Sequence, residues 1–83
     1  MDDIGDHLEL RVEAGGLRYY LAGKPIHAGG LLELLLDNGS WALGRFEWTY
    51  RKDDRPRFYV DTKSGDAFDL RPQSARLRWP KRE

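Results

Sequence analysis

The sequence predicts a small all-β barrel, and three observations support this prediction. Apolar residues alternate with polar residues over several short segments, which is the period of a half-buried β-strand. Glycine-containing turns separate these segments at the close spacing that is typical of small barrels and sandwiches. No segment carries an apolar repeat of helical period over the length that a helix needs. We therefore expect about five to seven short antiparallel strands, with an added N-terminal hairpin.

The added hairpin is predicted at residues 8–21. Leu8 to Glu13 alternates strictly, with apolar side chains at positions 8, 10 and 12, so we expect a half-buried strand. Gly15-Gly16 supplies the turn, and Leu17 to Leu21 alternates again. In this second strand, Tyr20 is expected on the face opposite to the inward residues.

The second hairpin, at residues 31–50, carries the strongest local signal. Leu31 to Leu36 is too short for a helix, because glycines precede it and Asn38-Gly39 follows it. Asn38-Gly39 predicts a tight type I′ turn, whose two central residues both need positive φ. Trp41 to Tyr50 returns as an aromatic-rich strand with even-numbered residues on one face. Gly44, in the middle of this strand, indicates a bend or a close approach of another backbone.

The C-terminal part is predicted to complete the sheet. Residues 57–61 form a strand with Phe58 and Val60 inward, residues 62–66 turn the chain, and residues 67–70 continue the pairing. One short helical turn at residues 71–75 precedes a last short strand at residues 76–79. A single domain is thus expected at residues 8–79, between a flexible acidic lead-in at residues 1–7 and a basic tail at residues 80–83.

Residues 26–50, and more loosely residues 26–79, resemble the SH3-like barrels of the Tudor and agenet type. The segments Leu31-Leu32-Glu33-Leu34, Gly39-Ser40-Trp41 and Gly44-Arg45-Phe46-Glu47 stand at matching places, and Ala75-Arg76-Leu77-Arg78-Trp79 fits the end of such a barrel. Bacterial domains of unknown function share this pattern. The resemblance implies an SH3-like barrel and places Trp41 where Tudor barrels hold an aromatic cage for a methylated cation. Residues 8–21 lie outside the resemblance.

The residues for catalysis and metal binding are sparse. The chain has no cysteine, and its two histidines, His7 and His27, are isolated. Asp53-Asp54 is a carboxylate pair, but Lys52 and Arg55 flank it in a polar loop. We therefore expect neither enzymatic activity nor a cofactor or metal site. The sequence shows no apolar stretch long enough to span a membrane and no secretory signal, so we expect a cytoplasmic protein that does not interact with membranes.

Two sets of residues remain as candidate binding sites. The first is a set of aromatic side chains that suit a protein-binding groove with charged rims, in an adaptor, regulator or inhibitor: Tyr20, Trp48, Tyr50 and Tyr59. The second is a set of basic residues interleaved with aromatic rings, which suits RNA or single-stranded DNA: Arg51, Lys52, Arg55, Arg57, Arg76 and Arg78. A formal net charge of +0 favours the protein-binding interpretation and leaves nucleic acid as the alternative. The sequence leaves the oligomeric state open.

Overall fold

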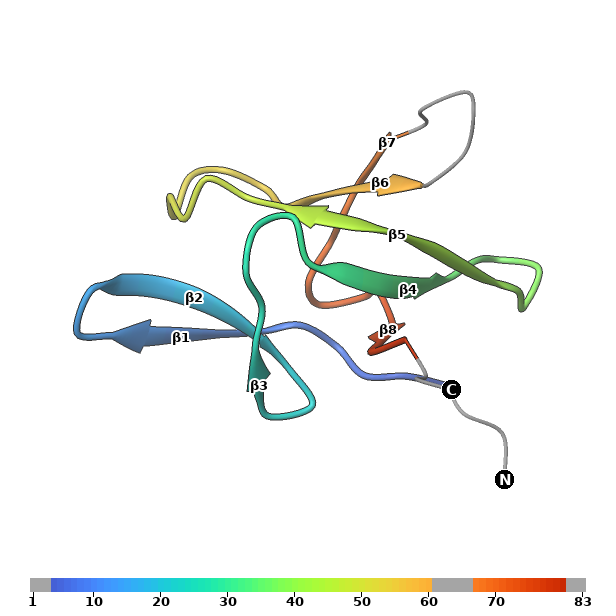
Figure 1. Ribbon diagram of the computed structural model, residues 1–83, viewed down its shortest axis with the longest axis horizontal. Helices are drawn as coiled ribbons and strands as arrows, with labels where there is room; N and C mark the ends of the chain where they lie inside the picture. The colour runs from blue at the N-terminus through green and yellow to red at the C-terminus, as the bar shows by residue number, and fades with distance from the viewer. Residues whose placement is uncertain (1–3, 61–66, 81–83) are drawn as a thin grey trace.

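The computed structural model describes residues 4–60 and 67–80, and these residues form two antiparallel β-sheets (Figure 1). The three-stranded sheet has the order β1-β2-β3, and its strands are β1 (Glu9–Glu13), β2 (Gly16–Leu21) and β3 (Lys24–Pro25). The five-stranded sheet has the order β7-β6-β5-β4-β8, and its strands are β4 (Leu31–Leu35), β5 (Trp41–Glu47), β6 (Arg57–Val60), β7 (Ala67–Asp69) and β8 (Leu77–Arg78). The described residues contain no helix. The predicted all-β class, with short antiparallel strands, is confirmed.

One hydrophobic core joins the two sheets. The three-stranded sheet supplies Tyr19 and Leu21, and the five-stranded sheet supplies Leu32, Phe46 and Phe58. Leu34 and Leu77 of the five-stranded sheet are also buried, and the other buried apolar residues lie in the connections: Leu8, Ile26, Trp48 and Leu70. Since burying one such side chain stabilises a fold by roughly 1.5–3 kcal/mol, this shared core holds the two sheets together.

Gly44 marks a close approach of two backbones, as its position in mid-strand predicted. It pairs with Val60 across the β5–β6 ladder. A Cβ atom at this position would lie 2.4 Å from the Tyr59 carbonyl oxygen and 2.6 Å from the Phe58 ring. Only glycine allows β5 to pack this closely against β6.

The turn between β4 and β5 differs from the predicted type I′ turn. Gly39 has a φ of 87°, but Asn38 has no positive φ. The Gly39 amide donates to the Leu36 carbonyl at 2.9 Å, and the Leu36 amide donates to the Ser40 carbonyl at 2.8 Å. This is a three-residue loop in which only the last residue is left-handed. The Asn38 side chain instead accepts a hydrogen bond from the Ser40 amide at 2.9 Å.

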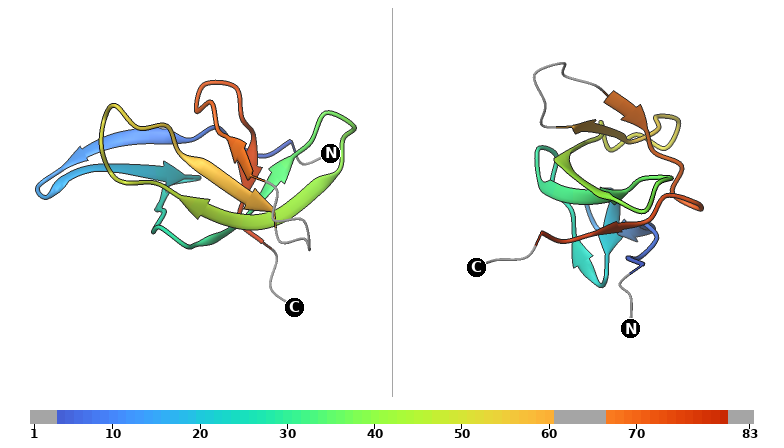
Figure 2. Two further views of the ribbon diagram at one scale, coloured as in Figure 1. Left: turned by 90° about the horizontal axis from the view of Figure 1, so that it is seen from above. Right: turned by 90° about the vertical axis from the view of Figure 1, so that its right-hand side faces the viewer.

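The β1–β2 hairpin projects away from the five-stranded sheet (Figures 1 and 2). The predicted strands and faces are present, and the two-residue turn is Ala14-Gly15, one residue earlier than expected. The prediction that the first strand is half-buried is wrong beyond Leu8. The Leu10 side chain is 42% exposed and the Val12 side chain is 83% exposed. The hairpin extends beyond the hydrophobic core, so no other described element covers its apolar face.

The ends of the described chain lie side by side. Asp6 forms a β-bridge with Leu77, and the ring of His7 bonds the Ala75 carbonyl oxygen at 3.1 Å, so these two residues of the expected lead-in are held against the last strand. The expected helical turn is a single hydrogen-bonded turn, in which the Ala75 amide donates to the Arg71 carbonyl at 2.7 Å. The expected turn at residues 62–66 and the tail at residues 81–83 lie outside the described residues. None of the described residues belongs to a helix that could cross a membrane.

Candidate functional site

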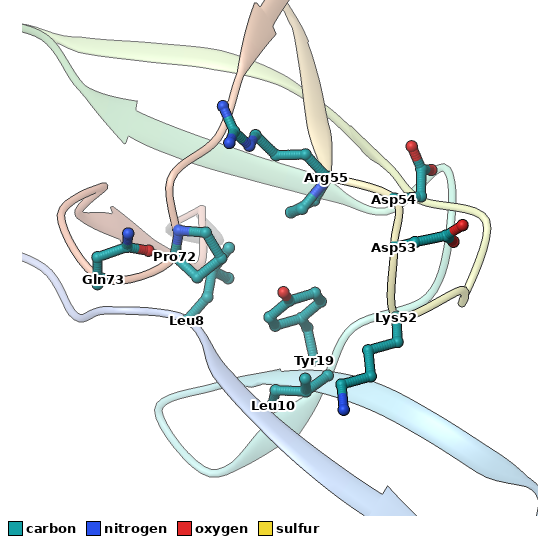
Figure 3. A pocket seen from close by; sticks show the side chains of 10 residues that line it. Leu8, Leu10, Tyr19, Lys52, Asp53, Asp54, Arg55, Pro72 and Gln73 are labelled. Carbon is teal, nitrogen blue, oxygen red and sulfur yellow. The ribbon is translucent and has the colours of Figure 1, made fainter.

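A groove separates the β1–β2 hairpin from the loop that joins β5 to β6 (Figure 3). We call it the hairpin groove; its volume is about 530 Å³. It is lined by Leu8, Leu10, Tyr19, Lys52, Asp53, Asp54, Arg55, Pro56, Pro72 and Gln73. Its floor is apolar, and charged side chains of both signs stand on the β5–β6 loop. This combination is typical of a surface that binds another protein.

The floor follows from the register of the hairpin. Leu10 pairs with Tyr19 across the β1–β2 ladder, so the two side chains lie on the same face. Leu8, two residues before Leu10, adds to this face and is buried. Val12 continues the same face beyond the groove and is almost fully exposed. The floor of the groove therefore extends as an apolar strip along the hairpin.

Trp48 connects the two walls of the groove. Its ring meets the Tyr19 ring edge-on, with 4.6 Å between the ring centroids. Its indole nitrogen donates a hydrogen bond of 2.8 Å to the Asp54 carbonyl oxygen in the β5–β6 loop. Because Trp48 is itself buried, it fixes the position of the hairpin relative to the loop and does not face the solvent.

The Tyr19 hydroxyl is a polar group within the apolar floor. Figure 3 shows the Tyr19 side chain projecting from the hairpin into the groove. No side-chain nitrogen or oxygen atom among the described residues is both buried and without a hydrogen-bond partner. The Tyr19 hydroxyl, which bonds no described residue, therefore reaches the open groove. Burial of the ring raises the pKa of Tyr19 above its ordinary value, so the hydroxyl stays protonated and can donate a hydrogen bond at neutral pH.

The rim of the groove is an ordered loop with mixed charge. The Thr49 hydroxyl donates to the Asp54 carboxylate at 2.8 Å, and this bond lowers the pKa of Asp54. The Asp54 amide donates to the Arg51 carbonyl oxygen at 3.1 Å, and the Arg51 guanidinium lies 3.3 Å from the Asp53 carboxylate. Lys52 stands at the hairpin side of this rim in Figure 3.

The structure does not bring the four predicted aromatic residues together in one groove. Trp48 and Tyr50 are neighbours, with 5.3 Å between ring centroids, but Trp48 is buried. Tyr20 lies on the polar face of the hairpin, where its hydroxyl donates to Glu13 and Arg11 covers its ring at 4.2 Å. Tyr59 lies on β6, with the Arg45 guanidinium 5.9 Å from its ring centroid.

Of the residues that line the groove, the sequence predicted only Lys52 and Arg55 as site residues. The floor residues Leu10 and Tyr19 are among those that it missed. Both were assigned to the inward side of the hairpin, because strict alternation places them there. The alternation correctly gives their common face, but it carries no signal of where the core beneath that face ends.

Most of the predicted basic residues lie next to acidic groups. Arg57 is 3.6 Å from Asp69, and Arg78 is 2.6 Å from Glu33 with both side chains half-buried. Arg51 faces Asp53, as described above, and Lys52 and Arg55 share the groove rim with Asp53 and Asp54. Arg76 is half-buried, and its carbonyl oxygen accepts a hydrogen bond from the Leu35 amide at 2.9 Å. The predicted basic residues therefore do not form a continuous positive surface.

Trp41, the residue at the position of the Tudor cage, is covered by the chain itself. The Arg78 guanidinium lies 4.0 Å from the centre of the Trp41 ring. Gly5 lies so close that a Cβ atom there would come within 2.7 Å of the same ring. The chain's own cation thus occupies the ring face that a methylated cation would need.

The described residues contain no group of histidine, cysteine and carboxylate side chains that could hold a metal ion. His7 bonds the backbone of Ala75, and the Nδ1 atom of His27 lies 3.0 Å from the Arg18 guanidinium.

Comparison with protein-family models, with curated proteins and with solved structures found no significant match to this chain. The resemblance to SH3-like barrels therefore stays a prediction.

Proposed function

We propose that this chain is a protein-binding module whose hairpin groove receives an extended segment of a partner protein. The observation that carries the proposal is the apolar strip of the hairpin, which runs from buried Leu8 through partly exposed Leu10 to exposed Val12. Exposed apolar side chains gathered on one face are characteristic of interaction sites, whereas single scattered ones are not.

The chemistry of the groove specifies the kind of segment. Apolar side chains of the partner pack against Leu10 and the Tyr19 ring. A backbone or side-chain acceptor of the partner accepts a hydrogen bond from the Tyr19 hydroxyl. On the rim, a basic residue of the partner pairs with Asp53 or Asp54, and an acidic residue pairs with Lys52. Such rim charges set orientation and association rate more than affinity. We therefore expect a segment with alternating apolar residues and charges of both signs.

Direct binding of RNA or single-stranded DNA is the weaker alternative. Its candidate residues mostly face carboxylates at short distance, so phosphate contacts would have to compete with ion pairs within the chain. Titration with short mixed-sequence RNA and single-stranded DNA should show no binding tighter than about 10⁻⁴–10⁻⁶ M at physiological salt. Submicromolar binding would rank the nucleic-acid function first.

The proposal is tested by selecting binders from a display library of random peptides and measuring their affinity for variants of the protein. Leu10→Thr should weaken the selected peptides by about tenfold or more, because it removes an apolar contact at the centre of the groove. Leu43→Thr is the matched control, since Leu43 is also a strand leucine with 42% exposure but does not line the groove. Equal losses in the two variants, or failure to select any peptide, would contradict the proposal.

A further inference from the structure

The two edges of the three-stranded sheet differ in how they are protected. At one edge, β3 has only two residues, Lys24 and Pro25, and both residue types block pairing with a further strand. At the other edge, β1 has five residues without proline or lysine. Its register with β2 is continuous from Glu9 to Glu13, so no bulge interrupts it. The β1 edge therefore lacks proline, lysine and a bulge, three of the features that prevent edge strands from associating.

The outward backbone groups of β1 belong to Leu10 and Val12. In an antiparallel pair, residues alternate between hydrogen-bonded and non-hydrogen-bonded partners. The Tyr19 carbonyl accepts a hydrogen bond from the Ile26 amide at 2.9 Å, on the side away from β1, so Leu10 and Tyr19 are a non-hydrogen-bonded pair. Val12 is two residues after Leu10 in the same ladder, so its amide and carbonyl also point outward. No described residue bonds to the outward amide or carbonyl of either.

The side chains of β1 divide into two faces. Leu10 and Val12 are exposed on the apolar face, and Glu9, Arg11 and Glu13 lie on the opposite face. The Arg11 guanidinium is 3.0 Å from the Glu9 carboxylate, and both side chains are largely exposed. A strand that pairs with this edge must therefore offer apolar residues on one face and alternating charges on the other.

We propose that the partner of this edge is β1 of a second copy of the chain, antiparallel and centred on Val12. Antiparallel registers centred on Leu10, on Arg11 or on Val12 all set apolar residues of one copy opposite apolar residues of the other. A register centred on Arg11 sets the two Arg11 side chains opposite each other, which is repulsive. In a register centred on Leu10, the hairpin turn of the second copy would lie beside Asp6. That place is occupied, because Asp6 already pairs with Leu77 of its own chain. Neither of these two registers is favourable.

The register centred on Val12 satisfies both charge and space. It sets Arg11 of each copy opposite Glu13 of the other, so opposite charges face each other, and Glu13 keeps its bonds to Arg18 and Tyr20 within the hairpin. The two Val12 residues exchange both backbone hydrogen bonds across the twofold axis, and their side chains meet on the apolar face. Because this axis is perpendicular to the sheet, the hairpin grooves of both copies open on the same side. The association needs no partner peptide and thus goes beyond the proposed function.

The first test is sedimentation equilibrium of the purified chain over a range of concentrations up to the millimolar. A short edge-strand contact is a small interface, so we expect a weak dimer with a Kd on the order of 10⁻⁴ M. Val12→Pro should abolish the dimer, because it removes an outward amide without breaking the β1–β2 ladder. Val12→Thr, which keeps the amide and the branched side chain, should retain it. A chain that stays monomeric, or a dimer that survives Val12→Pro, overturns the proposal.

The second test is a charge exchange that reads out the register. Arg11→Glu and Glu13→Arg should each lose the homodimer, since each sets like charges opposite each other. An equal mixture of the two variants should form a heterodimer, detected by its mass in native mass spectrometry. The control mixture is Arg11→Glu with Glu9→Arg, which would pair in the register centred on Leu10. Heterodimer in the control mixture alone overturns the Val12-centred register, and circular dichroism of each variant verifies that it is folded.

Discussion

The β1–β2 and β4–β5 hairpins are both antiparallel strand pairs, but they bury their apolar residues very differently. In β4, Leu32 is fully buried and Leu34 nearly so, because β8 and the core lie against that strand. In β1, Leu10 and Val12 occupy equivalent alternating positions and remain exposed. The difference teaches that alternation determines the face of a strand, whereas coverage of that face depends on which other elements reach it. In this chain the uncovered face is the one that we assign to binding.

The largest expected difference between the two hairpins is in the effect of removing an apolar side chain. Leu32→Ala should lower the free energy of unfolding by about 2–5 kcal/mol, because it leaves a cavity in the core. Val12→Ala should change it by no more than about 0.5 kcal/mol, because an exposed side chain leaves no cavity. Urea denaturation of both variants at a concentration where the chain is monomeric measures this difference. Similar losses would mean that the hairpin is packed against the body of the protein.

A second comparison concerns glycines in the two regions. Gly44→Ala should cost about 1–3 kcal/mol, because the added methyl group meets the Tyr59 carbonyl oxygen and the Phe58 ring. Gly15→Ala, in the turn of the β1–β2 hairpin, is the control, since no atom lies within 4 Å of the added group. Thermal denaturation of the pair should show a lower Tm for Gly44→Ala alone. A wild-type Tm in both variants would show that β5 and β6 are less tightly packed than described.

The β4–β5 turn offers a smaller effect. Gly39→Val should destabilise the protein by roughly 1 kcal/mol or more, because a β-branched residue is strained at a φ of 87°. The steric environment adds nothing to this effect, since space around Gly39 is open. Chemical denaturation measures the change. An unchanged midpoint would mean that Gly39 is not left-handed in solution.

The smallest effect is expected on the polar face of the β1–β2 hairpin. The Tyr20 hydroxyl, and after it Arg18, lowers the pKa of Glu13 from its ordinary value. A depressed carboxyl pKa stabilises the folded state above the unfolded pKa, and this contribution is lost as the pH falls through the folded pKa. In Tyr20→Phe the Glu13 pKa should rise toward its ordinary value while the Arg11–ring contact is kept. NMR titration of the Glu13 carboxyl carbon measures the shift, and an unchanged pKa would contradict the assigned hydrogen bond.

Local patterns were sufficient to predict most of the fold. Alternation gave most of the strands and their faces, including buried Phe46 and Phe58, but not the two-residue strand β3. Mid-strand Gly44 indicated either a bend or a close approach, and the structure has the close β5–β6 contact. The type of the β4–β5 turn was missed, because Asn38-Gly39 fits both a two-residue turn and the three-residue loop that forms. What distinguishes them is the register of Leu36 with Ser40, which depends on packing beyond the turn.

The candidate site was only partly predictable. Of the predicted site residues, Lys52 and Arg55 line the groove, whereas none of the four predicted aromatic residues does. The sequence assigned Trp48 to the surface, whereas the indole connects the hairpin to the β5–β6 loop from a buried position. It also could not pair Arg78 with Glu33, because these residues are far apart in the chain and meet only through the β4–β8 ladder. Such long-range contacts decide which charges remain available to a partner.

The exposure of Val12 and Leu10 in the monomer supports both the groove and the dimer, and methyl NMR with a soluble paramagnetic probe measures it directly. In a dilute sample, the Val12 methyl groups should show strong relaxation enhancement and those of Leu10 an intermediate one. The methyl groups of Leu32 should show almost none, because its side chain is fully buried. Val12 methyl groups as protected as those of Leu32 would show that the hairpin folds back onto the protein, and would contradict the account.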